Sequence, residues 1–223
     1  MMKAIVFDLD GTLLNTLEDI RASINYARIA FDGEPISLDD TRRYVGNGLR
    51  KALVSSILEH GPRLECEDEV DLMFQLMVQY YKNHPAVYSK PYDGILSLLD
   101  CLKTSGYKLA ILSNKADSIV QEITQKCFKK DLFDIVQGQR SELSLKPDPM
   151  ALLGIIKRLM CNNDDVLYIG DSEVDYKTAI NANVKHLIVS YGFRSKEELE
   201  RSGIFDSIAH VPTMMDIERG LSS

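Results

Sequence analysis

Two aspartates stand two positions apart near the start of the chain, in the segment Asp8-Leu9-Asp10-Gly11-Thr12. They directly follow the apolar run of residues 4–7, and Gly11 permits a sharp turn there. Paired carboxylates at a strand end can divide nucleophilic and acid–base roles or bind a hard metal ion. The pattern alone is weak, because turns are generally rich in aspartate. Leu13 and Asp19 occupy the positions where a calcium-binding EF-hand loop needs glycine and glutamate, which disfavours that kind of site.

A second pair of acids follows another apolar run. Residues 166–169 lead into Gly170-Asp171-Ser172-Glu173-Val174-Asp175. If a helix begins near Ser172, Asp175 lies in its first turn and can turn back toward the end of the strand. Alternatively, the carboxylate of Asp175 could simply interact with the positive end of the helix dipole.

Two further segments offer groups that bind anions. Ser113-Asn114-Lys115 follows the apolar run of residues 109–112 and precedes a helical pattern, so its hydroxyl and backbone amides could form a small anion site. The alternative is an ordinary Ser or Asn helix N-cap.

In Lys146-Pro147-Asp148-Pro149, Pro147 favours an extended backbone at Lys146, and Pro149 suits the first position of a helix. Lys146 would then leave a fixed loop; the alternative is a solvated surface lysine.

Short apolar runs predict the elements that position these groups. We expect buried strands at residues 4–7, 109–112, 166–169 and 187–189, with helix-period stretches between them. This alternation predicts a doubly wound, Rossmann-like α/β core with a parallel sheet. Ligands of such sheets bind beyond the carboxyl ends of the strands, so all four polar segments should meet at one edge.

One long segment departs from this alternation. Residues 15–90 show helical periodicity without a convincing strand, and the strand ends at Asp8 and Ser113 are 113 − 8 = 105 positions apart. A βαβ unit needs only about 30 residues. We therefore predict a helical domain over residues 15–90, inserted into a core formed by residues 1–14 and 91–223.

Composition excludes several classes of protein. The 223 residues include 33 acidic and 26 basic side chains, a net charge of 26 − 33 = −7, which argues against a nucleic-acid binder. We find neither a secretory signal nor an apolar run of about 18 residues, and therefore predict a cytoplasmic protein without membrane contact. The four cysteines lie more than 25 residues apart, without a Cys-x-x-Cys pair that would indicate zinc or redox chemistry.

The polar segments together resemble the four ordered motifs of the haloacid dehalogenase superfamily. These are Asp8-x-Asp10-x-Thr12, Ser113, Lys146 and Gly170-Asp171-x-x-x-Asp175. The helical insert is similar to the type 1 cap of that family. The resemblance extends from about residue 3 to residue 190.

The resemblance implies a role for each matching residue. Asp8 resembles the nucleophile that forms an aspartyl-phosphate, and Asp10 resembles the general acid and base. Ser113 and Lys146 resemble the phosphate ligands, and together with Asp8 and Asp10 they are the predicted catalytic residues. The predicted ligands of a Mg²⁺ cofactor are Asp8, the backbone carbonyl of Asp10, Asp171 and Asp175, the last of which could instead orient the lysine.

These residue types suit phosphoryl transfer. A carboxylate that attacks a dianionic phosphoryl group is repelled unless cationic groups cancel the charge, and Lys146 and Mg²⁺ would do so. Asp10 would protonate the leaving oxygen and later deprotonate the attacking water. A dehalogenase usually lacks this second aspartate, so Asp10 favours a phosphatase.

The insert offers the best indication of the substrate. The basic, glycine-containing segment 41–50 suits closure over an anionic substrate, although it could also be a solvated loop between helices. Its Val-Gly-Asn-Gly pattern and the Pro91-Tyr92-Asp93-Gly94 segment are similar to the phosphoglycolate phosphatase branch of the family. We therefore expect a small phosphorylated metabolite, with 2-phosphoglycolate as the best single candidate. The predicted substrate-binding residues are Thr12, Asn114, Arg43, Gly46 and Asn47.

Four other functions stay open. Related caps also serve pyrophosphatases and nucleotidases. A phosphomutase of the β-phosphoglucomutase type shares all four motifs, although Thr12 and the segment 45–50 depart from its pattern. A phospho-acceptor signalling domain also uses Asp, Ser or Thr and Lys at strand ends, but it is much shorter and lacks acids after the lysine. We expect a monomer or a homodimer.

Overall fold

A computed structural model describes residues 3–46, 48–63, 66–142, 144–205 and 208–209. Internal contacts divide the chain into two compact units, one formed by residues 1–15 and 91–223 and the other by residues 16–90. Where the chain passes between them, Leu14–Asn15 (β2) and Lys90–Pro91 (β3) pair as a small two-stranded sheet. In the part of the chain that the structure describes, no helix is long and apolar enough to cross a membrane.

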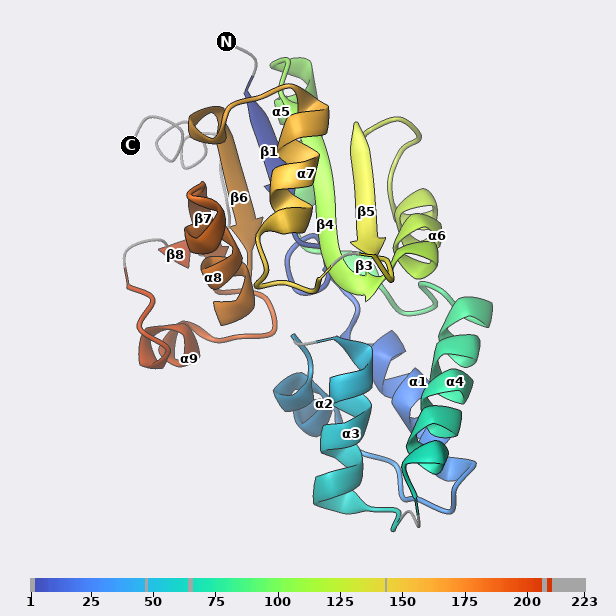
Figure 1. Ribbon diagram of the computed structural model, residues 1–223. Coiled ribbons are helices and arrows are strands. Elements are labelled where there is room, and N and C mark those ends of the chain that lie inside the picture. Colours follow the sequence, from blue (N-terminus) through green and yellow to red (C-terminus); the bar gives the residue numbers. More distant parts are fainter. Residues whose placement is uncertain (1–2, 47, 64–65, 143, 206–207, 210–223) are drawn as a thin grey trace. The chain divides into compact units, whose positions relative to one another are not determined.

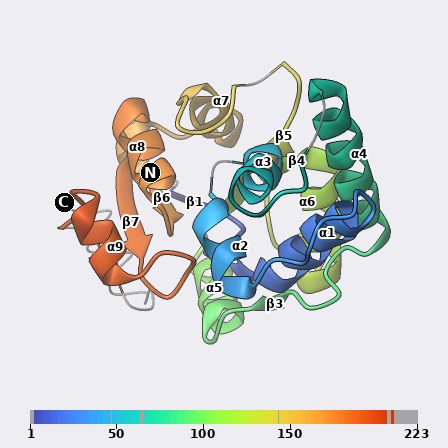
Figure 2. The same cartoon turned by 90° about the horizontal axis from the view of Figure 1, so that it is seen from below.

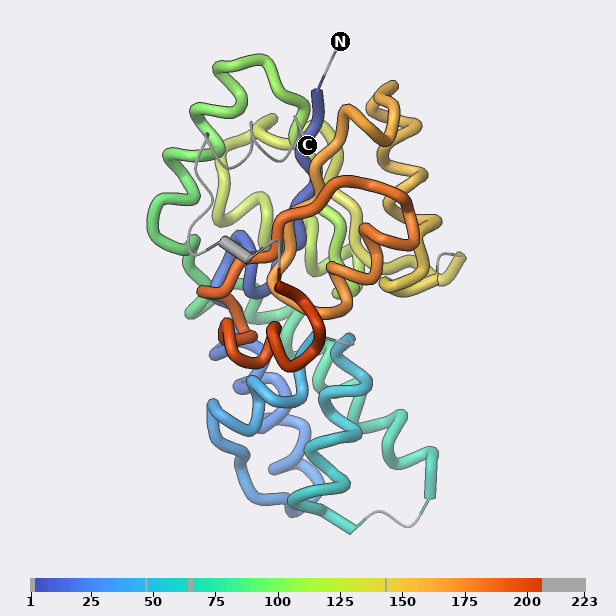
Figure 3. The backbone as a smooth tube through the Cα atoms, turned by 90° about the vertical axis from the view of Figure 1, so that its left-hand side faces the viewer, coloured from blue at the N-terminus to red at the C-terminus, as the bar shows by residue number. Residues whose placement is uncertain are grey.

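The first unit is built on a six-stranded sheet with the order β5-β4-β1-β6-β7-β8 (Figure 1). All adjacent strands are parallel. The strands are Ala4–Phe7 (β1), Lys108–Ala116 (β4), Ile135–Gln139 (β5), Val166–Gly170 (β6), Lys185–Val189 (β7) and Ile208–Ala209 (β8). β1 runs through the middle of this unit, between β4 and β6, which come from much later in the chain (Figure 3). The predicted doubly wound α/β fold is confirmed.

Helices cover both faces of this sheet, with α7 in front and α5 behind it in Figure 1. The helices of this unit are Ile95–Thr104 (α5), Asp117–Cys127 (α6), Met150–Leu159 (α7), Glu173–Ala182 (α8) and Lys196–Arg201 (α9). Alternate strand residues, such as Val6, Leu112 and Tyr168, form one core with the apolar faces of α7 and α8. Strands buried on both faces explain why their sequences read as continuous apolar runs.

The sheet differs from its prediction in two respects. β4 continues beyond Leu112 to Ala116, with a register irregularity, so Ser113-Asn114-Lys115 belongs to a strand end rather than to a helix N-cap. α6 begins only at Asp117. The strands β5 and β8 have no counterpart among the four predicted runs, because β5 carries two glutamines and a glycine and β8 has only two residues.

The second unit consists of helices packed around their apolar faces. They are Leu17–Ile29 (α1), Leu38–Tyr44 (α2), Leu49–His60 (α3) and Glu67–Asn83 (α4). α1 lies alongside α4, as Figure 2 shows. A capping box of Ser37 and Asp40 satisfies backbone donors at the start of α2.

Arg28, near the end of α1, is the central polar connection of this unit. It is completely buried, and its guanidinium donates to the backbone carbonyls of Glu34 (2.8 Å), Ser56 (2.8 Å), His60 (3.2 Å) and Gly61 (2.5 Å). Five donors in a fixed fork suit this bridging of several carbonyls. Arg28 therefore joins α1 to the following loop and to the end of α3.

We expect Arg28→Met to lower the free energy of unfolding by about 2–4 kcal/mol, because buried carbonyls would lose their donors. The matched control is Arg21→Met on the same helix, where the arginine is about a third exposed and pairs with Glu18. It should cost less than about 1 kcal/mol. Urea unfolding followed by circular dichroism measures both variants, and equal losses would contradict the role of Arg28.

Candidate active site

The strand order brings the predicted catalytic segments together. β1 lies between β4 and β6, with Phe7 paired to Ile111 on one side and to Ile169 on the other. Asp8, Ser113 and Asp171 therefore follow these pairs at neighbouring strand ends. This is the edge where parallel α/β sheets bind their ligands.

Three carboxylates meet at this edge. Oxygen atoms of Asp8, Asp171 and Asp175 all lie within 4.8 Å of one another, and all three residues are buried. Burial raises the pKa of Asp8 to about 7, with Asp175 and Asp10 adding to the effect and Lys146 opposing it. Burial, together with the charges of Asp175 and Asp8, also raises the pKa of Asp171 well above its usual range.

Lys146 lies between two of these acids. Its buried Nζ is 2.7 Å from Oδ1 of Asp175 and 2.9 Å from Oδ1 of Asp8. Burial alone would lower the pKa of Lys146, but Asp175 and Asp8 raise it well above its usual value. The structure thus makes this lysine a buried cation of the acid cluster rather than a solvated surface group.

Asp175 differs from the other two acids because protein donors occupy both of its oxygens. Oδ1 accepts from Lys146 and from the Tyr168 hydroxyl (2.8 Å), and Oδ2 accepts from the Ser172 hydroxyl (2.5 Å). Burial tends to raise its pKa, but Lys146 and these hydrogen bonds hold the pKa below its ordinary value. Asp175 is also the third residue of α8, in a capping box with Ser172.

The cluster fits a divalent metal ion. Fully ionised, the three carboxylates and Lys146 carry a charge of 1 − 3 = −2, and the donors are all hard oxygens. Among the described residues, no group donates to Oδ2 of Asp8 or Oδ1 of Asp171. The buried Thr12 hydroxyl likewise has no hydrogen-bond partner in that part of the chain.

Two glycines allow the backbone to approach Asp171 closely. Gly11 has a φ of +86°, and a Cβ built there would lie 2.2 Å from Oδ2 of Asp171. A Cβ on Gly192 would lie 2.3 Å from the Gly11 carbonyl and 2.4 Å from the same carboxylate oxygen. The neighbouring amide of Phe193 donates to Asp171 at 2.7 Å. The sequence prediction missed Gly192 and Phe193, because an isolated glycine after a strand is generally interpreted as a turn residue.

Asp10 is held from the side of β4. Lys115 Nζ lies 2.6 Å from its Oδ1, and the Ser113 hydroxyl lies 3.4 Å from its Oδ2. The sequence prediction gave Lys115 no role.

Asn114 holds the loop that carries Lys146. Its side-chain oxygen accepts from the Lys146 amide (2.8 Å), and its NH₂ group donates to the Lys146 carbonyl (3.1 Å). Asp148 accepts from the Met150 amide (2.9 Å) at the start of α7, where Pro149 is the N-cap residue. A contact between Asn114 and substrate stays a prediction.

The remaining predicted substrate-binding residues lie in the helical unit. Arg43 is about half exposed and pairs with Asp40 (2.5 Å) and Glu59 (3.3 Å). Gly46 follows α2 with a φ of +114°. Asn47 lies outside the described residues. A role in substrate binding stays a prediction for all three.

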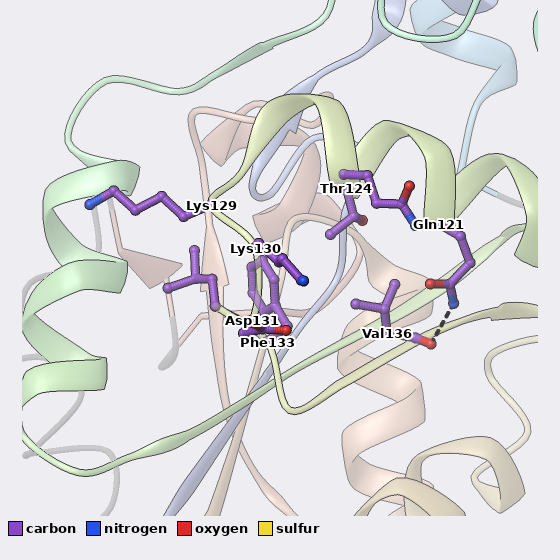
Figure 4. Close-up of a pocket in the computed structure, with 9 residues that line it drawn as sticks. Gln121, Thr124, Lys129, Lys130, Asp131, Phe133 and Val136 are labelled. Carbon is purple, nitrogen blue, oxygen red and sulfur yellow. Dashed lines mark hydrogen bonds between the residues drawn. The ribbon is translucent and has the colours of Figure 1, made fainter.

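A separate hollow of about 590 Å³ lies between the end of α6 and the start of β5 (Figure 4). Its lining includes Thr124, Lys130, Phe133 and Val136. None of the predicted site residues lines it. The predicted catalytic and metal-binding groups therefore belong to the acid cluster and not to this hollow.

Comparison with known proteins agrees with this site. The family described as haloacid dehalogenase-like hydrolase matches residues 5–189. A phosphoglycolate phosphatase from Cereibacter sphaeroides is 30% identical over 222 residues, which cover 99% of each chain. Crystal structures of proteins from Lactobacillus delbrueckii subsp. bulgaricus and Haemophilus somnus, the latter described as a predicted phosphoglycolate phosphatase, are 30% and 28% identical. Each structure matches with a TM-score of 0.84 over 98% of this chain. The match covers 98% of the Lactobacillus protein and 97% of the Haemophilus protein. The chain therefore belongs to the haloacid dehalogenase-like hydrolases, and it is a phosphatase of that family.

Proposed function

We propose that this phosphatase removes phosphate from a small metabolite, with Mg²⁺ as cofactor and Asp8 as nucleophile. The observation that carries the proposal is the position of Asp8 at the end of β1, 2.9 Å from the buried ammonium of Lys146 and beside Asp171. A nucleophilic carboxylate next to a fixed cation suits attack on an anionic phosphoryl group.

The residues would act in two steps. An oxygen of Asp8 forms a bond to phosphorus while the bond to the leaving oxygen breaks, and Asp10 gives that oxygen a proton. Asp10 then takes a proton from water, whose oxygen attacks phosphorus and breaks the bond to Asp8. Lys146 and the Ser113 hydroxyl hold the phosphoryl oxygens through both steps. Free phosphate leaves, and Asp8 and Asp10 return to their starting states.

The metal would be held by Asp8, Asp171 and the backbone carbonyl of Asp10. Bound Mg²⁺ supplies positive charge that neutralises the phosphoryl oxygens. Because protein donors already occupy both oxygens of Asp175, we propose that this residue supports the site by orienting Lys146.

The substrate proposal rests on the relatives. Those named phosphoglycolate phosphatase match nearly the whole chain at about 30% identity, which favours 2-phosphoglycolate. We propose that residues 15–90 act as a cap domain that selects the substrate through Arg43, Gly46 and Asn47. Other phosphate esters, pyrophosphate and nucleotides are the alternatives that an assay must include.

Asp8→Asn tests the nucleophile while keeping the side-chain shape. We expect wild-type protein with Mg²⁺ to release phosphate from 2-phosphoglycolate, and the variant to be at least about a thousandfold slower. The control is Asp100→Asn, an exposed acid of α5 that pairs with Lys129. Full activity of Asp8→Asn would overturn the assignment. Isomerisation of a sugar phosphate without net phosphate release would favour a mutase.

Mg²⁺ should stabilise the folded protein, because it relieves repulsion among buried carboxylates. At a concentration of 100 times its Kd, a ligand adds about 2.7 kcal/mol of stability. Thermal unfolding with Mg²⁺ and with EDTA measures this gain without any assay of activity. We expect Asp171→Asn to remove most of the shift and Asp100→Asn to retain it. An undiminished shift in Asp171→Asn would exclude that carboxylate as a ligand.

Gly192→Ala tests the close approach beside Asp171. Its Cβ would collide with the Gly11 carbonyl and with Asp171, and overpacking of this kind costs about 1–3 kcal/mol. We expect Mg²⁺ affinity, measured by calorimetry, to fall roughly tenfold or more. Gly154→Ala is the matched control, since a Cβ there meets no atom within 4 Å and alanine favours the helix. If Gly192→Ala bound Mg²⁺ as tightly as the wild-type protein does, the backbone at residue 192 would be free to move away from Asp171, and the close approach would not matter for the metal.

A further inference from the structure

Lys115 is a second buried lysine at the end of β4. Only 2% of its side-chain surface is exposed, and its ammonium is 2.6 Å from Oδ1 of Asp10. A lysine is seldom buried without an acidic partner, because desolvation of the charge is costly. The proposed mechanism uses Asp10 but gives Lys115 no task.

The end of β4 places its side chains on two sides. Ser113 and Lys115, two residues apart, both reach Asp10, whereas Asn114 between them reaches the Lys146 loop. This is the alternation expected of a strand. The two oxygens of Asp10 are thereby distinguished, because Oδ1 faces Lys115 and Oδ2 lies on the side of Ser113.

Asp10 needs such support because its own backbone is irregular. It follows β1 in a turn where the Leu9 carbonyl accepts from the amides of Leu13 and Leu14, both at 3.0 Å. No regular strand or helix fixes its side chain, which is 17% exposed. The contacts from Ser113 and Lys115 of β4 therefore help to set the direction of its carboxyl group.

We propose that Lys115 is a positioning residue that holds the Asp10 carboxyl group by Oδ1, so that Oδ2 faces the phosphoryl group and exchanges the proton. The inference rests on the proposed function, in which Ser113 binds that phosphoryl group. A protonated carboxyl group still accepts through its carbonyl oxygen, so the bond to Lys115 is compatible with both states of Asp10. In the first step the proton passes from Oδ2 to the leaving oxygen, and in the second it returns from water.

Leaving-group dependence distinguishes this role from a direct substrate contact. Alkoxide leaving groups need a proton in the transition state, whereas p-nitrophenolate is stable enough to leave with little help. We would measure kcat/KM, which reports the first step, for 2-phosphoglycolate, ethyl phosphate and p-nitrophenyl phosphate. Ethyl phosphate lacks the carboxylate of phosphoglycolate and so reveals any contact between Lys115 and that group.

In Lys115→Met we expect kcat/KM to fall roughly 10- to 100-fold for the two alkyl esters and less than about threefold for p-nitrophenyl phosphate. Lys115→Gln retains a hydrogen-bond donor and should lose less with the alkyl esters. It also serves as the test variant if the methionine protein does not fold. Lys103→Met is the control for loss of a lysine–aspartate pair outside the site, with Asp134 at 2.7 Å.

A double-mutant cycle completes the test. If Lys115 acts through Asp10, adding Lys115→Met to Asp10→Asn should change kcat/KM for ethyl phosphate less than about threefold. Equal loss with all three esters, or loss with 2-phosphoglycolate alone, would overturn the inference in favour of a substrate contact. Wild-type protein inactive on every ester would instead overturn the proposed function itself.

Discussion

Mutual repulsion among buried carboxylates is the constraint on which the α/β unit depends. Asp8, Asp171 and Asp175 approach within 4.8 Å in surroundings where water cannot screen them. Such a cluster costs folding free energy, and only a rigid frame keeps it together. The frame is the central trio of parallel strands, whose ends cannot separate without breaking the ladders on both sides of β1.

The aspartates of this cluster differ in their hydrogen-bond partners and in their pKa values. Asp175 accepts from Lys146, Tyr168 and Ser172, and its pKa lies below the ordinary value. Asp171 accepts a hydrogen bond from the Phe193 amide, and burial raises its pKa well above the ordinary value. The donors around Asp175 thus make it a permanent counter-ion of Lys146. Asp8 and Asp171 are left with the excess negative charge that a cation would neutralise.

The parts of the site that sequence predicts are those that strand ends specify. Asp8, Ser113 and Asp171 each follow an apolar run, and parallel topology alone is enough to place them at one edge. To place Asp175, the prediction needed only one further assumption, that a helix begins near Ser172, and α8 does begin there. Local pattern therefore sufficed wherever a residue's position follows from the element that carries it.

Lys115 and Gly192 could not be found in that way, because their significance lies in contacts with distant segments. Lys115 reaches Asp10 across 105 positions of sequence, and it does so only because β4 continues past the end of its apolar run. Gly192 matters because its missing Cβ leaves room for Gly11 and Asp171. The sequence around each residue does not indicate its role, since an isolated lysine is usually predicted to be exposed and an isolated glycine to lie in a turn. The sequence is therefore enough to identify the acids of this site. Lys115, which contacts Asp10, and Gly192, which packs against Asp171, can be identified only once the three-dimensional arrangement of the strands is known.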